Sequence, residues 1–368
     1  MDDQKGSGQQ IGVCMATPLL AIRSLHIVYS WYRKEGIPQT MGLLLQLLFV
    51  GLSNGAIYAL IALGYTMVYG IIELINFAHG DIFMIGSLVA ISTLTLLGIT
   101  DASAPTGWTL VSVMLLSFLS AMLACAVLGV VIERVAYRPL RNAPRLAPLI
   151  SAIGVSLILQ DLGKLWKGVS PVPFPMGLHQ IFLTTAFTVE TVQISIANIL
   201  VIVVAVVLMI SLQWLVTRTR TGRAMRAVAQ DREAAALMGV NVNTIISTTF
   251  FIGASLAGAA GFIYALQFGG TIFTIGYQLG LIAFTAAVFG GIGNLVGAML
   301  GGLSIGLIES LATYIPDSDR TTHFLFNIPL GIPHGGEAWT RAIIFGILIL
   351  TLVFRPSGLL GQQTPEKV

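Results

Sequence analysis

The chain has 368 residues, of which 55% are hydrophobic and only 10% are charged, and its mean hydropathy is +0.88. A soluble domain carries about 25% charged residues, so this composition excludes an ordinary soluble protein and predicts one that lies in lipid. The formal net charge of +3 is too small to indicate a nucleic-acid partner. Cys14 and Cys125 are the only cysteines, which excludes a disulfide framework and a cysteine-based metal site.

The first 40 residues differ from the rest of the chain. Their longest apolar stretch, 11–32, is interrupted by Arg23 and His26, and a transmembrane span needs about 20 largely uncharged residues. No small-residue cleavage pattern follows a clean apolar core, so a signal peptide is not predicted. Two interpretations of 1–40 stay open: an upstream start that is not native, with Met41 as the true start, or a real cytoplasmic or interfacial arm.

Apolar runs long enough to cross a bilayer of about 30 Å recur along the remaining chain. Backbone groups in lipid must be satisfied internally, so these runs predict helices. The ten-residue alternation of a porin-like barrel is absent. The sequence therefore predicts an all-α, polytopic transmembrane helical bundle with about eight or nine membrane segments, including broken or re-entrant helices. The runs are 43–70, 82–99, 108–132, 147–162, 192–216, 246–268, 276–293, 295–315 and 341–354.

The distribution of Lys and Arg among the connections predicts the orientation. Eleven lie in the connections 133–145 and 217–245 and in the tail after 354, whereas three lie in 100–107, 163–191 and 316–340. Cytoplasmic loops carry the excess of positive charge, so the first set is expected inside. This orientation sends 43–70 from outside to inside, which would place the basic residues of 1–40 outside. Either Met41 is the true start, or 43–70 is a broken, partly re-entrant element.

Two interrupted stretches are candidates for the translocation path. Ionisable residues at membrane depth are costly and usually face a cavity or a partner, although a polar turn at the membrane surface would explain the first stretch equally well. Glycine-interrupted segments often meet near the substrate path of transporters. The candidate path residues are Glu73, Asn76, His79, Gly80 and Asp81 in the first stretch, and Gly290, Gly291 and Asn294 in the second.

The connection 217–245 is rich in helix formers and too charged to enter lipid. A short helix here is expected to have an apolar side formed by Ala224, Ala227, Val228, Ala235 and Leu237. Composition alone favours an ordinary positively charged inner loop. The pattern Glu233-Ala234-Ala235-x-x-x-Gly239 changes that balance because it resembles the EAA loop of ABC importer permeases. The resemblance implies a short coupling helix that docks on an ATPase subunit, formed by Arg223, Arg226, Glu233, Ala234, Ala235 and Gly239.

The resemblance extends over nearly all of 41–368, a single permease domain. It rests on the segments 59–70, 75–81, 132–141, 149–154, 284–293 and 356–361. Together these are similar to the LivH-type permeases of branched-chain amino acid ABC importers, multi-pass proteins of the bacterial inner membrane. The sequence departs from that family in the 1–40 extension and in a polar insert at 317–338.

Membership would imply four kinds of partner. A related second permease would complete a heterodimer, two ATPase subunits would bind the ATP, and a periplasmic or extracellular binding protein would deliver leucine, isoleucine or valine. This chain would need no cofactor of its own.

Other functions have less support in the sequence. The phosphate-binding pattern Gly-x4-Gly-Lys-Ser/Thr is absent, since Gly163-Lys164 is followed by Leu165, so the chain is not expected to hydrolyse ATP. Motifs of an intramembrane hydrolase are also absent. Two alternatives stay open: an ABC permease for urea, amides or other amino acids, and a stand-alone ion-coupled transporter. The latter needs paired intramembrane charges, for which Glu73, Asp81 and Glu309 are available.

Overall fold

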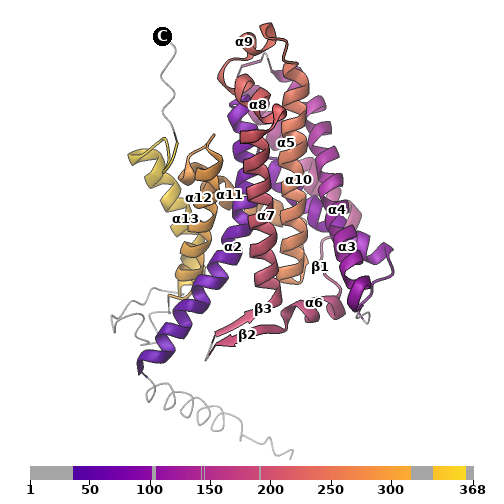
Figure 1. The fold of residues 1–368 in the computed structure, drawn as a ribbon, viewed down its shortest axis with the longest axis vertical. Helices are drawn as coiled ribbons and strands as arrows, with labels where there is room; N and C mark the ends of the chain where they lie inside the picture. Colours follow the sequence, from indigo (N-terminus) through magenta and orange to yellow (C-terminus); the bar gives the residue numbers. More distant parts are fainter. Residues whose placement is uncertain are drawn as a thin grey trace, which may run out of the picture.

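The computed structural model describes residues 36–101, 105–141, 143–144, 146–189, 192–315 and 335–361. Within these ranges the protein is a bundle of helices, and the strands are limited to two short antiparallel pairs (Figure 1). Most of the 1–40 extension and most of the 317–338 insert lie outside the described residues.

The described residues contain twelve α-helices and four short strands. The helices are α2 (Gly36–Ile72), α3 (His79–Leu96), α4 (Gly107–Ile132), α5 (Leu146–Lys167), α6 (Met176–Leu183), α7 (Ile196–Arg218), α8 (Arg220–Gln230), α9 (Arg232–Leu237), α10 (Val242–Phe268), α11 (Ile275–Gly290), α12 (Leu295–Thr313) and α13 (Gly335–Phe354). A π-helical turn (Glu133–Tyr137) and a 3₁₀ turn (Arg138–Leu140) continue α4. The strands are β1 (Val172–Pro173), β2 (Thr185–Val189), β3 (Val192–Ser195) and β4 (Gly270–Thr271), with β1 paired to β4 and β2 to β3.

The helices confirm the predicted polytopic bundle. Among the described residues, seven are long and apolar enough to cross a membrane, and α11 and the 338–354 part of α13 are shorter apolar helices. The first span is one continuous helix up to Ile72, so the interpretation of 43–70 as a broken element is wrong. The chain breaks after this helix instead.

Close helix pairs explain much of the glycine content. A Cβ added to Gly55 of α2 would lie 2.8 Å from the Cα of Leu303 in α12. A Cβ on Gly258 of α10 would lie 2.5 Å from the carbonyl oxygen of Ala121 in α4. Small residues let membrane helices approach to backbone contact, so these pairs form the packed centre of the bundle.

The helix α3 begins inside the bundle and not at its surface. Its first residue, His79, lies beside Tyr65 of α2, with the two ring centroids 4.9 Å apart. Tyr65 precedes the end of α2 by about 10 Å, at a rise of about 1.5 Å per residue. The connection 73–78 therefore turns back along α2 before α3 starts.

A second connection, 269–274, turns back in the same way after α10. Thr271 shares a hydrogen bond of 2.7 Å with Ser87, well inside α3, and Gly276 in the first turn of α11 lies against Gly80. A Cβ on Gly80 would come within 2.7 Å of the Cα of Gly280. The starts of α3 and α11 therefore meet inside the bundle, as expected for the re-entrant segments in the predicted fold.

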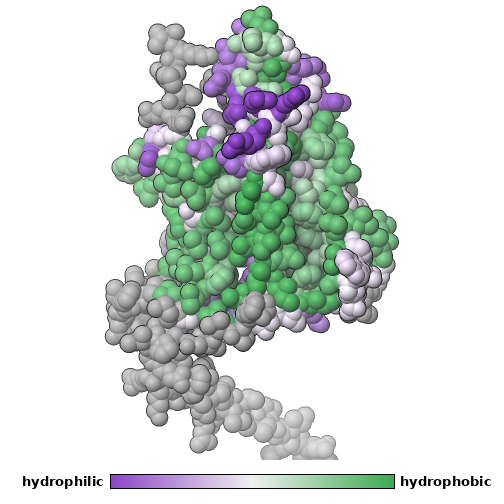
Figure 2. Space-filling model, viewed as in Figure 1, coloured by the Kyte–Doolittle hydropathy of each residue, from purple (hydrophilic) through white to green (hydrophobic). Residues whose placement is uncertain are grey.

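The two ends of the bundle carry different elements (Figure 1), and the visible surface is more hydrophilic at one end than between the ends (Figure 2). We call the end that carries α8 and α9 the α9 end, and the end that carries α6 and the β2–β3 hairpin the α6 end. Hydrophilic residues gather over α8 at the α9 end, and an apolar band covers the visible faces of α7 and α10 between the ends. The band is the part of the surface suited to lipid.

Candidate coupling segment and polar groups of the bundle

The segment 217–245 folds into two short helices because two side chains cap them. The hydroxyl of Thr219 accepts a hydrogen bond of 3.0 Å from the N–H of Gly222 at the start of α8. The Asp231 carboxylate accepts bonds from the N–H groups of Glu233 and Ala234 at the start of α9, at 2.9 and 3.0 Å. Such N-caps each stabilise a helix by about 1 kcal/mol.

Some apolar residues of these two helices pack against the bundle, and others are exposed to solvent. Val228 of α8 and Ala235 of α9 are buried, as expected, and Arg223, Arg226, Glu233 and Ala234 lie at the exposed side. Leu237 and Met238 are 88% and 84% exposed, contrary to the inward side expected for Leu237. The tip of the α9 end therefore carries an apolar contact surface amid charge (Figure 2).

Gly239 ends α9 with a left-handed backbone. Its φ is +83°, and its N–H donates to the carbonyl of Ala236, while the N–H of Val240 donates to that of Ala235, both at 3.0 Å. These two bonds define a Schellman motif, which favours glycine at this position. Gly239 therefore fixes the direction in which the chain leaves α9, as predicted from its spacing to Glu233.

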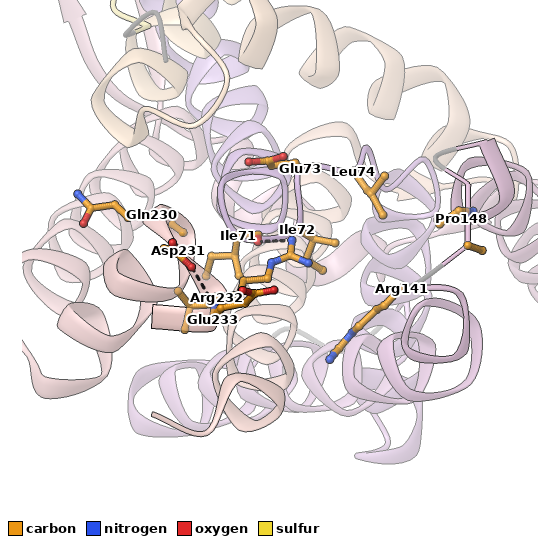
Figure 3. Close-up of a pocket in the computed structure, with 13 residues that line it drawn as sticks. Ile71, Ile72, Glu73, Leu74, Arg141, Pro148, Gln230, Asp231, Arg232 and Glu233 are labelled. Carbon is orange, nitrogen blue, oxygen red and sulfur yellow. Dashed lines mark hydrogen bonds between the residues drawn. The ribbon is translucent and has the colours of Figure 1, made fainter. Parts of the chain in front are cut away.

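Arg232 connects α9 to the end of α2. Its Nη2 donates a hydrogen bond of 2.8 Å to the carbonyl oxygen of Ile71 (Figure 3). The last carbonyls of a helix have no partner within the helix, so this bond satisfies one of them. It lies in a pocket of about 510 Å³ that is also lined by Glu73, Arg141 and Glu233. Glu73 has a φ of +59° and is exposed at this pocket.

A buried ion pair between Glu133 and Arg141 also stabilises the α9 end. Glu133 is fully buried, pairs with Arg141, and accepts a hydrogen bond of 2.7 Å from the hydroxyl of Ser247 in α10. Partial burial lowers the pKa of Arg141 from its usual value, and the neighbouring Glu133 carboxylate opposes that shift. The pair ties the turn after α4 to the start of α10.

Asn76 organises the break between α2 and α3. Its Oδ1 accepts a hydrogen bond of 3.1 Å from the N–H of Ala78 and one of 3.0 Å from the hydroxyl of Tyr137. Both Asn76 and His79 are buried. Burying a polar group costs free energy unless it is hydrogen-bonded, so the two bonds to the Asn76 oxygen support the turn that places His79 beside α2.

Asp81 lies where α3, α5 and α11 meet. Its carboxylate accepts hydrogen bonds from Ser156 and, at 3.4 Å, from the amide of Gln160, both on α5. The other carboxylate oxygen, Oδ1, is buried and has no hydrogen-bond partner among the described residues. Gly276 of α11 faces it. Asp81 is therefore a polar centre inside the bundle rather than part of a surface turn.

The remaining path candidates lie at the α9 end. Gly290 and Gly291 end α11, and the Asn294 side chain caps α12 by accepting from the N–H of Gly297 at 3.1 Å. The Asn294 amide also donates to the carbonyl of Leu360 at 2.8 Å. The structure thus separates the predicted path residues into a buried group, Asn76, His79, Gly80 and Asp81, and a group at the α9 end, Glu73, Gly290, Gly291 and Asn294.

Two features of the coupling segment were not predicted. Arg232 follows the helix cap and was counted only as a loop cation, because its acceptor Ile71 is distant in sequence. Met238 was treated as a spacer within the glycine pattern. No group of three or more His, Cys, Asp or Glu side chains that could hold a metal occurs within the described ranges.

Comparison with known proteins shows which permeases the chain resembles. A family model described as "Branched-chain amino acid transport system / permease component" matches residues 47–352. The permease protein BraD of a high-affinity branched-chain amino acid transport system in Pseudomonas aeruginosa is 43% identical over 325 residues, covering 88% of this chain and 98% of BraD. The permease LivH of Escherichia coli K12 is 39% identical, covering 88% of this chain and 97% of LivH.

A probable LivH protein of Methanocaldococcus jannaschii is 29% identical over 82% of this chain and 88% of its own length. The family match covers both the coupling segment and the paired starts of α3 and α11, so these features lie inside the shared domain. The chain belongs to the family of permease components of branched-chain amino acid transport systems.

Proposed function

We propose that the chain is the LivH-type permease subunit of a binding-protein-dependent ABC importer that carries leucine, isoleucine and valine across the bacterial inner membrane. The single observation that supports this most is the α8–α9 segment, which is capped, ends in a Schellman motif and exposes Leu237 and Met238. An apolar tip within a charged surface is suited to a groove on another protein. We assign that groove to an ATPase subunit.

The proposed orientation places the α9 end in the cytoplasm. The basic residues of the α8–α9 segment and of the turn after α4 lie at this end, and the positive-inside rule favours it. The α6 end then faces the binding protein. A related second permease and two ATPase subunits complete the assembly.

The bond between Arg232 and Ile71 supports a route for coupling. A movement of α9 on the ATPase would be passed to the end of α2 and to the turn at Glu73. That turn leads to Asn76, which positions the start of α3. We assign the buried group of path residues to the passage wall and its support, and Gly290, Gly291 and Asn294 to the inner mouth.

Substrate class is tested by uptake in a bacterial strain that lacks its own branched-chain amino acid importers. The strain would receive this chain with its second permease, its ATPases and its binding protein. Radiolabelled leucine should enter, and excess isoleucine or valine should compete. Competition by urea or acetamide, with none by isoleucine or valine, would favour the alternative substrates. Uptake without the ATPase subunits would overturn the ABC mechanism.

A further inference from the structure

A cationic side chain in the first half of α13 is exposed on the protein surface. It belongs to Arg341, the first residue of the last apolar run. About 20 Å of helix separates it from Phe354, where α13 ends. The segment after Phe354 bonds to the end of α11: Leu359 and Leu360 donate to Phe289 and Gly290 at 2.9 and 3.0 Å. Arg341 is therefore far from the α9 end of a bilayer whose core is about 30 Å thick.

The partner of Arg341 places it near the middle of the bundle independently. Its Nη2 reaches the Oε1 of Gln278 at 3.4 Å. Gln278 is in the first turn of α11, beside the junction of Gly276 and Gly80, where the two re-entrant segments meet. Long cationic side chains near a membrane surface usually extend toward the headgroups. The guanidinium of Arg341 instead points to the start of a helix inside the bundle.

The surfaces of α13 and α5 each carry an exposed charge, whereas the visible middle of α7 is apolar (Figure 2). The exposed side chains of α7 at comparable depth are apolar, among them Val203, Val207 and Ile210. On α5, in contrast, Asp161 is exposed within the span and has no ion-pair partner among the described residues. The helix α5 packs on α3, α3 on α11, and α11 on α13. Intramembrane charges of this kind face a partner or a water-filled path.

We propose that Arg341, with Gln278 beside it, binds the α-carboxylate of the transported amino acid as it passes the starts of α3 and α11. The proposal rests on the proposed function and names a binding residue for it. An arginine guanidinium presents several N–H donors that match a carboxylate. The bond to Gln278 is long and uses one of these donors, which leaves the others for a ligand. A neutral-side-chain amino acid has its carboxylate as the only anionic group, so one cationic position would serve all three substrates.

The test uses the complete complex in cells and in proteoliposomes. Arg341→Gln should lower leucine uptake by about 10- to 100-fold, the range expected for losing a charged hydrogen bond. Binding-protein-stimulated ATP hydrolysis and co-purification of the second permease should persist. Arg341→Lys should keep part of the uptake. The matched control is Arg355→Gln, which removes the same charge from the residue that follows α13 at the α9 end and should leave uptake unchanged.

Chemical rescue separates a charge requirement from a structural one. In a background with Cys14→Ser and Cys125→Ser, Arg341→Cys should transport poorly, and a methanethiosulfonate reagent that attaches an ethylammonium group should restore uptake. The matching reagent that attaches a sulfonate should not. Leucine should slow the modification.

Three outcomes would overturn the proposal. The first is unchanged leucine uptake in Arg341→Gln. The second is loss of the second permease from the Arg341→Gln complex, which would assign the guanidinium to a carboxylate of that partner. The third is an equal effect of the ethylammonium and sulfonate reagents on Arg341→Cys. Failure of the proposed function is distinct, because the unmodified complex would then import no leucine.

Discussion

At Gly239 the backbone conformation, rather than a shortage of space, restricts the residue. A Cβ built there meets no atom within 4 Å, but φ is +83°, and a left-handed conformation costs other residues about 1–2 kcal/mol. Asparagine tolerates this region better than branched residues do. We therefore expect Gly239→Val to abolish stimulation of the ATPase by the loaded binding protein, and Gly239→Asn to retain most of it.

The control for this prediction is the membrane level of each variant, measured by quantitative immunoblot. Ala235→Asp should resemble Gly239→Val because Ala235 is 4% exposed and a carboxylate there would be desolvated. Normal stimulation and uptake in both variants would show that α9 does not dock on the ATPase.

Asn76 and Asn294 each hold two groups that an apolar side chain would leave without a partner. Asn76→Leu removes the acceptor of Ala78 and Tyr137, and Asn294→Leu removes the cap of α12 and the bond to Leu360. A buried group left unpaired costs about 1–3 kcal/mol. Uptake at matched membrane levels should fall more than in Ser120→Ala and Thr95→Val.

Those two controls are chosen because the hydroxyls of Ser120 and Thr95 donate to carbonyls of their own helices, and the further bond of Ser120 to Thr93 is far from the connection 73–78. Equal uptake in all four variants would contradict a role of the asparagines in the passage or its support.

The sequence could predict residues whose role is local. The glycine spacing after Glu233 predicted the end of α9, because a Schellman turn depends on neighbouring residues only. Arg341 and Arg232 could not be read in this way. Their partners, Gln278 and Ile71, are distant in the chain and are brought close only by tertiary packing.

Among the elements, α8 and α6 mark opposite ends of the bundle and allow a direct test of orientation. Ala229 in α8 and Met176 in α6 are both exposed. In a cysteine-free background, Ala229→Cys should resist an impermeant thiol reagent in intact cells and react after the membrane is opened. Met176→Cys should react in intact cells. Labelling of position 229 from outside would reverse the orientation and remove the α9 end from the ATPase.

Hydropathy located the helices well but misjudged some of their ends by about three residues. The run 82–99 corresponds to α3, which begins at His79, and 276–293 corresponds to α11, which ends at Gly290. Apolar content identifies material suited to lipid, but it carries no information on depth. The re-entrant connections 73–78 and 269–274 became apparent only from contacts such as that of Gly80 with Gly276. Of the β2–β3 hairpin, β2 lies within the predicted connection 163–191 and β3 within the start of the predicted run 192–216.

At the scale of the molecule, the two long helix pairs of α2 with α12 and α10 with α4 enclose the starts of α3 and α11. The unit of α2 and α3 and the unit of α10 and α11 run in opposite directions, each with a long helix, a connection that turns back and a helix that starts inside the bundle. Inverted units of this kind commonly place binding groups at their junction. Arg341 and Gln278 lie beside that junction.

The distribution of polar groups also predicts which side meets the second permease. Gly154 of α5 has no atom within 4 Å of an added Cβ, and Asp161 lies about two turns further along the same helix. On α7, Ile210 is 64% exposed within the apolar band. Because lipid chains rearrange around a large apolar side chain whereas a packed subunit does not, Gly154→Trp should reduce co-purification of the second permease, and Ile210→Trp should not. Equal recovery of the second permease with both variants would assign α5 to lipid and require another explanation for the exposed charge of Asp161.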